Sequence, residues 1–158
     1  MKIKEIYKSQ DDDEKVELIN SLNFNDYEDK WDLILEVIQD ENEYDLARIE
    51  AFKVIEIANI PEIILDRLCD VVINLLKNEN DYDVKNYAFI ASRNLINNSI
   101  EIKNYIEKIV LSKEEDIDIK HNAYSAILKI KDQAEKTKIL NSLLDDEVFS
   151  KYAKKDLN

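Results

Sequence analysis

The sequence repeats itself at a spacing of 35 residues, and this repeat limits the possible folds more than any other feature. Residues 83–91 read DVKNYAFIA and residues 118–126 read DIKHNAYSA, so Asp, a β-branched residue, Lys, Ala, an aromatic residue and Ala recur at the same offsets. A third copy, residues 44–52, has one extra residue between the Asp and the basic position, and a degenerate copy covers residues 146–153. Such repeats are typical of stacked supersecondary units, each of which buries its apolar face against its neighbours.

Each position of the repeat has a physical role in a helix. The Asp is a good N-cap, because its carboxylate accepts hydrogen bonds from the free backbone N–H groups of the first turn. The alanine that follows one turn later lets a neighbouring helix approach closely. The basic residue (Arg48, Lys85 or Lys120) opposes the helix dipole in the first turn. We therefore expect it to have an acidic partner, such as the capping Asp of an adjacent repeat.

Between the copies lie other segments with apolar residues at helical spacing. Residues 28–39 place Trp31 on an apolar stripe, and residues 61–77 begin with Pro61, which suits the first turn of a helix. The same periodicity occurs in residues 12–22, 101–112 and 133–144. No segment alternates like a β-strand, so the sequence predicts an all-α protein of about nine helices joined by short loops.

The segment from Pro61 to Ile96, PEIILDRLCDVVINLLKNENDYDVKNYAFIASRNLI, resembles a HEAT repeat. A proline opens its first helix, leucine-type spacing follows, and Asp, Val and a basic residue open the second. Lys85 and Lys120 depart from the family pattern, where arginine is usual, whereas Arg48 keeps it. The resemblance covers residues 28–131 and implies a single domain over residues 1–158, a right-handed α-solenoid of about four HEAT-like helical hairpins. It places the second helices near residues 45–58, 83–97, 118–130 and 146–157.

The chain contains no glycine, which excludes several kinds of enzyme site. Average usage of about 7% predicts about 11 glycines in a chain of this length. Phosphate-binding loops and dinucleotide-binding turns need glycine, because the backbone must approach the anion closely. We expect Asn and Asp to form the turns, because they tolerate left-handed backbone better than other residues do.

The one cysteine and the one histidine offer little chemistry. Cys69 lies in an apolar helical segment next to Asp70, which favours a buried thiol over a reactive one. His121 aligns with Asn86 in the repeat, which favours a polar surface position. One His and one Cys would need unusual carboxylate ligands to hold zinc, and the acidic run at residues 11–14 lacks the glycine of a calcium-binding EF-hand loop. We therefore predict no catalytic residue, cofactor or metal, and no enzyme activity.

Negative charge is concentrated in the first third of the chain. The net charge is −13, and residues 11–50 contain 15 acidic residues but three basic ones. A field of this sign repels nucleic acid and anionic lipid, and it attracts cationic surfaces. Two interpretations remain open: a solvated face that keeps the protein soluble, or a surface that steers a basic partner. The segregation of charge favours the second, because solubility does not require it.

Four residues of this acidic segment are spaced by four and are expected to form a stripe on one helical face: Glu28, Asp32, Glu36 and Asp40. Like charges at this spacing repel one another. We predict that this stripe and its flanking residues bind the partner, although Tyr27 and Tyr44 have packing at loop ends as an alternative role. The predicted partner-binding residues are Asp26, Tyr27, Glu28, Asp29, Asp32, Glu36, Asp40, Glu43 and Tyr44. A secondary set, on the curved face of the repeats, comprises Asn86, Arg93, Asn97 and His121.

Together these features predict a protein-binding module. Composition typical of an AT-rich bacterial genome, small size and acidity favour an immunity protein that neutralises a toxin, expected to be a basic nuclease whose phosphate-attracting site an acidic inhibitor complements. Neither nucleic acid nor membrane is an expected partner, since no apolar run approaches the roughly 18–20 residues of a spanning helix. The start of the chain lacks the apolar centre of a secretory signal, which favours the cytoplasm. The alternatives are a general HEAT-repeat adaptor or scaffold, and a degenerate HEAT-like lyase or DNA glycosylase.

Overall fold

A computed structural model describes residues 2–158. Within this range the chain forms ten α-helices, one 3₁₀-helix and no strand, which confirms the all-α prediction. The helices are α1 (Ile3–Lys8), α2 (Asp12–Ser21), α3 (Lys30–Gln39), α4 (Asp45–Ile57), α5 (Glu62–Asn78), α6 (Tyr82–Ala91), η1 (Ser92–Asn94), α7 (Ile100–Leu111), α8 (Ile117–Ile127), α9 (Gln133–Ser142) and α10 (Ser150–Asp156). The sequence predicted about nine helices and missed α1, whose six residues are too few to show a helical period.

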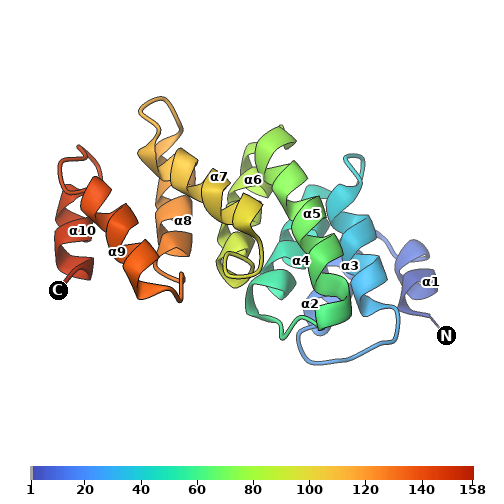
Figure 1. The fold of residues 1–158 in the computed structure, drawn as a ribbon. Coiled ribbons are helices and arrows are strands. Elements are labelled where there is room, and N and C mark those ends of the chain that lie inside the picture. The colour runs from blue at the N-terminus through green and yellow to red at the C-terminus, as the bar shows by residue number, and fades with distance from the viewer. Residues whose placement is uncertain (1) are drawn as a thin grey trace.

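The helices form two rows of neighbours that run along the molecule (Figure 1). In one row α2, α4, α6 and α8 pack successively on one another, and in the other row α1, α3, α5 and α7 do the same. Helices α9 and α10 pack together at the C-terminal end. The loops that follow α3, α5, α7 and α9 therefore lie at one edge, uppermost in Figure 1, and the loops that follow α2, α4, α6 and α8 lie at the opposite edge.

Small residues let helices α4, α6 and α8 of the first row approach one another closely. Ala88 of α6 and Ala123 of α8 are completely buried, as the repeat predicts. The same is true of Ala47, Ala51, Ala91 and Ala126 on these helices and on α4. Each alanine lies in a core that extends along the whole stack.

Replacing Ala88 or Ala123 with leucine is expected to lower the free energy of unfolding by about 1–3 kcal/mol, because added methyl groups force the close-packed helices apart. Urea unfolding monitored by circular dichroism measures this change. The control is Ala134→Leu, because Ala134 is exposed on α9. Equal stability of all three variants and the wild type would mean that these alanines do not set the helix spacing.

The N-caps lie two residues before the repeated Asp, which corrects one part of the sequence interpretation. Asp81 caps α6 by accepting the N–H of Val84, and Asp116 caps α8 by accepting the N–H groups of Asp118 and Ile119. These two copies each have an Asp-X-Asp segment, and the earlier aspartate is the N-cap, whereas α4 and α10 have no side-chain cap. Turns also differ from expectation, since no described residue has a positive φ. The Asn-rich loops thus turn without left-handed backbone.

The basic residue of the repeat finds its expected acidic partner at Arg48. Its guanidinium donates to the Ile38 carbonyl at 3.0 Å and to the Glu79 carboxylate at 2.5 Å, and the two charged side chains are 2% and 6% exposed. Arg48 lies on α4 and Glu79 is the C-cap of α5, so this ion pair joins the helix pair α3–α4 to the helix pair α5–α6. Lys120 is equally buried, but its ammonium lies 5.5 Å from the centre of the Phe149 ring and forms no ion pair with a described residue.

Candidate functional site

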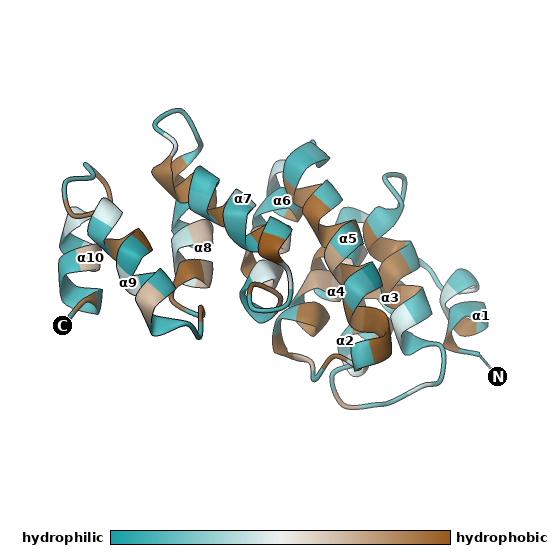
Figure 2. Cartoon of the chain, viewed as in Figure 1, coloured by the Kyte–Doolittle hydropathy of each residue, from teal (hydrophilic) through white to brown (hydrophobic). Residues whose placement is uncertain are grey.

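Acidic residues gather in four loops at the upper edge of the stack in Figure 1, each of which joins the two helices of a pair. We call this surface the acidic edge, and it consists of residues 40–45, 79–83, 114–118 and 145–147. These segments hold 14 acidic residues and no Lys or Arg. Figure 2 shows that the edge is largely hydrophilic. Acidic side chains thus form a line over four successive loops and not only in the first third of the chain.

Several carboxylates of the acidic edge have no structural task in the described part of the protein. Nine exposed acids form no ion pair there; Asp116 caps α8 and Asp118 accepts from Tyr82, and the other seven are Asp40, Glu41, Asp45, Asp83, Glu114, Asp145 and Glu147. The others hold the fold: Glu43 pairs with Lys15 at 2.9 Å, and Glu79 pairs with Arg48. The exposed set is therefore available to a partner without loss of a cap or of an internal ion pair.

A tyrosine connects two loops of the acidic edge. The Tyr82 hydroxyl donates to Asp118 at 2.7 Å and shares a contact of 3.1 Å with Asp116. The hydrogen bond to Asp118, together with desolvation, raises the Tyr82 pKa to about 12, so the hydroxyl stays protonated at neutral pH. Tyr82 is half exposed, and tyrosines of this kind are enriched at protein interfaces.

Asp29, one of the predicted partner-binding residues, has a structural role. Its carboxylate is buried and accepts the backbone N–H groups of Ile3 at 3.0 Å and Lys4 at 3.2 Å, so it caps α1. Burial raises the pKa of this carboxyl, but the N–H groups of Lys4 and Ile3 outweigh that effect and the pKa lies below its ordinary value. Asp29 is therefore ionised, and its carboxylate holds the N-terminal helix α1 in place.

The predicted acidic stripe is shorter than expected and is largely neutralised. Helix α3 begins at Lys30, so Glu28 lies before it in a loop. Glu36 pairs with Lys4 at 2.5 Å and Lys8 at 3.5 Å, and the hydrogen bond from Lys4 lowers the pKa of Glu36. Asp32 contacts Arg67 of α5 at 3.3 Å. Cations from other helices thus relieve the repulsion, so a stripe of like charge is no evidence for a partner.

The remaining residues of the primary set lie at opposite edges. Asp26, Tyr27 and Glu28 belong to the loop between α2 and α3, where Asp26 approaches Lys30 at 3.4 Å and Tyr27 is 38% exposed. Asp40, Glu43 and Tyr44 belong to the acidic edge, and Tyr44 packs against the core. The structure therefore does not bring the nine predicted residues into one patch.

The secondary set consists mainly of residues that connect helices and loops. Asn86 is buried and links α6 to α8, because its side-chain oxygen accepts from Asn122 at 2.8 Å. Arg93 is half-buried and pairs with Glu56. Asn97 accepts the N–H of Lys131 and donates to the carbonyl of residue 129, both at 2.9 Å. His121 is exposed, with its ring 5.2 Å from that of Phe149.

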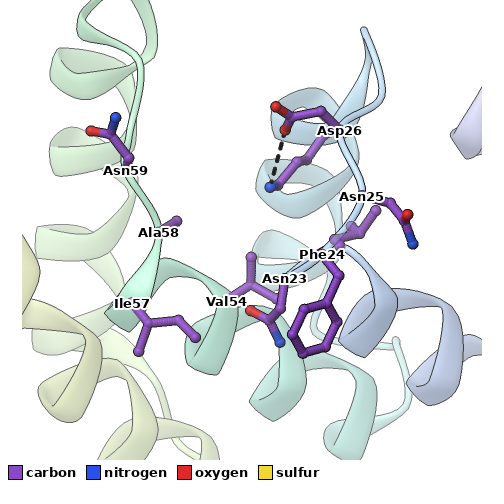
Figure 3. Close-up of a pocket in the computed structure, with 10 residues that line it drawn as sticks. Asn23, Phe24, Asn25, Asp26, Val54, Ile57, Ala58 and Asn59 are labelled. Atoms are coloured by element: carbon purple, nitrogen blue, oxygen red, sulfur yellow. Dashed lines mark hydrogen bonds and ion pairs between the residues drawn. The ribbon is translucent and has the colours of Figure 1, made fainter.

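A cleft that the sequence patterns did not predict lies between the α2–α3 loop and the end of α4 (Figure 3). Its volume is about 360 Å³, and two exposed apolar residues, Phe24 and Ile57, stand at it with 86% and 70% of their surfaces exposed. Three amides line it as well: Asn23, Asn25 and Asn59. The sequence signal was an aromatic residue between two asparagines in a loop.

The single cysteine, Cys69, has a buried thiol. Cys69 is buried, as predicted, and burial together with Asp66 and Asp70 raises its pKa to about 11. The thiol is therefore protonated at neutral pH. Within residues 2–158, no three His, Cys, Asp or Glu side chains are grouped so as to hold a metal ion.

No protein-family model matches the sequence, and neither a curated protein nor a solved structure matches the chain. None of the helices in the described part of the chain has the length and apolar character required to span a membrane. The candidate site therefore depends on the geometry and the charges of the chain itself.

Proposed function

We propose that the protein is a HEAT-type α-solenoid that binds and neutralises a basic protein in the bacterial cytoplasm. The partner class that fits best is a toxin with nuclease activity, for which this protein would be the immunity protein. The observation that carries the proposal is the acidic edge, where four neighbouring loops present exposed carboxylates and a single cation, Lys113 in the third loop. Two continuous rows of packed helices support the solenoid, because they hold these loops in line.

The physical basis is electrostatic complementarity. Carboxylates that are exposed and unpaired raise the rate at which a cationic protein meets the surface, and they disfavour nucleic acid and other anionic partners. A nuclease must carry positive charge where it holds phosphate, so the acidic edge can cover the same surface that nucleic acid would occupy. Tyr82 adds contact area at low cost in conformational entropy.

A general adaptor is the second candidate, and the cleft at Phe24 and Ile57 favours it. An adaptor needs two surfaces, and this cleft lies at the edge of the stack opposite the acidic edge. The two candidate functions differ in the number of partners that are bound at the same time: an immunity protein needs one partner, whereas an adaptor holds two.

Capture of partners from the native host tests the proposal. A tagged protein is compared with an edge variant, Glu41→Gln/Asp83→Asn/Glu114→Gln/Asp145→Asn, whose four altered residues are exposed and form no ion pair. The control variant removes the same charge elsewhere: Glu17→Gln/Glu62→Gln/Asp66→Asn/Asp70→Asn. We expect a basic protein on the wild type and the control but not on the edge variant. Equal capture by both variants, or no basic protein at all, would reject the proposal.

A further inference from the structure

Three loops of the acidic edge carry the same short motif, in which one apolar or aromatic residue stands between two acidic residues. The motif is Glu43-Tyr44-Asp45 in the first loop, Asp81-Tyr82-Asp83 in the second and Asp116-Ile117-Asp118 in the third. In each loop the central residue lies at the start of a helix: Tyr44 is the N-cap of α4, and Tyr82 and Ile117 are the first residues of α6 and α8. We call these three side chains the apolar row.

The apolar row is accessible at the second and third loops. Tyr82 and Ile117 are 48% and 47% exposed, whereas Tyr44 is half-buried against the core. The Tyr82 hydroxyl reaches both acids that flank Ile117, Asp116 at 3.1 Å and Asp118 at 2.7 Å, so the Tyr82 side chain spans the distance to the third loop. These contacts fix the position of the Tyr82 ring. This part of the surface is therefore formed before a partner binds.

The charge around the apolar row is mainly negative. Asp45, Asp83 and Glu114 are exposed and form no ion pair with a described residue. The single cation in the three loops, Lys113, is outnumbered by the four acids of residues 114–118. A second copy of this chain, with a net charge of −13, would be repelled from such a surface. A partner with Lys or Arg on both sides of an apolar stripe would complement it.

The cations of the repeat lie on the helices that begin at the row, and they are less accessible than the acids. Arg48 is buried and paired with Glu79. Lys85 is half-buried, and Lys120 is buried. These side chains therefore leave the exposed carboxylates of the loops as the charges that a partner meets first.

The spacing of the row fits an α-helix better than an extended strand. Helices α4, α6 and α8 pack on one another in succession, and packed helices lie about 8–10 Å apart. The row thus offers one side chain about every 8–10 Å. Seven residues of an α-helix rise about 10.5 Å and return to nearly the same face. An extended strand covers that distance in about three residues, which places successive side chains on opposite faces.

We propose that the apolar row receives an amphipathic α-helix of the basic partner, an inference that rests on the proposed function. The apolar stripe of that helix, with one heptad per loop, covers Tyr44, Tyr82 and Ile117. Its Lys and Arg side chains, on both flanks of the stripe, meet the exposed carboxylates. The charges speed association, and the apolar contacts slow dissociation. A partner that is basic but not apolar would meet the acidic edge and dissociate quickly.

The test uses a fluorescently labelled, blocked peptide of two Leu-Lys-Lys-Leu-Leu-Lys-Leu heptads, which as a helix has leucine on one face and lysine on the other. In one counterpart alanine replaces every leucine, and in the other glutamate replaces every lysine. Fluorescence anisotropy at low salt should show saturable binding of the leucine–lysine peptide, binding about tenfold weaker of the alanine–lysine peptide, and none of the leucine–glutamate peptide. Equal binding of the two lysine peptides would overturn the proposal, because charge alone would then explain the contact.

Variants that keep the net charge locate the contact on the row. Tyr82→Ser/Ile117→Ser should weaken binding of the leucine–lysine peptide about tenfold, because it removes apolar surface. Ile57→Ser/Ile100→Ser is the control, since these isoleucines are 70% and 73% exposed and lie at the opposite edge. Tyr82→Phe/Ile117→Leu keeps the apolar surface and should bind like the wild type. Equal effects of the two serine variants, or loss of binding by the conservative variant, would overturn the proposal.

Circular dichroism shows whether each variant is folded. If Tyr82→Ser/Ile117→Ser unfolds, Ile117→Ser is compared with Ile100→Ser instead, because both residues begin a helix and are exposed. We expect Ile117→Ser to weaken binding of the peptide about threefold and Ile100→Ser to leave it unchanged. Equal binding by these two variants would also overturn the proposal.

The two proposals fail in different ways. If the edge variant loses a basic protein but Tyr82→Ser/Ile117→Ser binds the leucine–lysine peptide like the wild type, the helix site on the apolar row is rejected and the proposed function stands. If the peptide binds at the row but the edge variant captures the same proteins as its control, the proposed function is rejected.

Discussion

Replacing Arg48 with alanine is expected to lower the free energy of unfolding by about 3–5 kcal/mol, because it leaves a charged partner buried without compensation. Glu79 is 6% exposed at its side chain and accepts from Arg48 at 2.5 Å. Its other carboxylate oxygen accepts the N–H groups of Asn80 and Asp81, so Glu79 also holds the turn between α5 and α6. The substitution also takes a donor from the Ile38 carbonyl.

Arg67→Ala is the matched control for this prediction. Arg67 contacts Asp32 at 3.3 Å, but the two side chains are 61% and 54% exposed. Water screens such a pair, so its loss should cost less than about 1 kcal/mol. Urea unfolding of the two variants gives the comparison. If Arg48→Ala were no less stable than Arg67→Ala, the buried pair would not join the helix pairs as described.

Much of the fold is predictable from the sequence, because local features specify it. The 35-residue repeat and the apolar spacing place α2 to α10, and the buried alanines follow from the same repeat. Helix α1 is different. It is held by Asp29, a residue 26 positions away from Ile3, and a contact of that kind leaves no periodic signal. The pairing of Glu36 with Lys4 also joins residues that lie far apart in the sequence, so it leaves no periodic signal either.

The candidate site was harder to predict, for two physical reasons. A net charge taken over a segment adds carboxylates in loops to cations on helices, so residues 51–158 look nearly balanced although 10 of their 19 acidic residues belong to the acidic edge. The two nearly identical loops ENEYD and ENDYD, residues 41–45 and 79–83, carried the signal that would have found it. Exposure was the second difficulty. Phe24 and Ile57 have the side chains of core residues, and only the fold shows that they face solvent.

Reversing charge on the acidic edge is expected to slow association with the basic partner by about tenfold or more at low salt, within the range that electrostatic steering contributes to association rates. The variant is Asp83→Lys/Glu114→Lys/Asp145→Lys. These three residues are exposed, cap no helix and form no ion pair with a described residue. Stability should therefore change by less than about 0.5 kcal/mol for each substitution. Asp29 is unsuitable for this test, because its reversal would release α1.

The most direct measurement is the association rate of the captured basic partner with the wild type and with this triple variant, at low ionic strength and again near 0.5 M salt. We predict a slower rate for the variant at low salt and a much smaller difference at high salt, because salt screens exposed charges beyond the Debye length. The dissociation rate should change less than the association rate. Equal association rates at low salt would contradict the account, since the partner would then not meet the protein at the acidic edge.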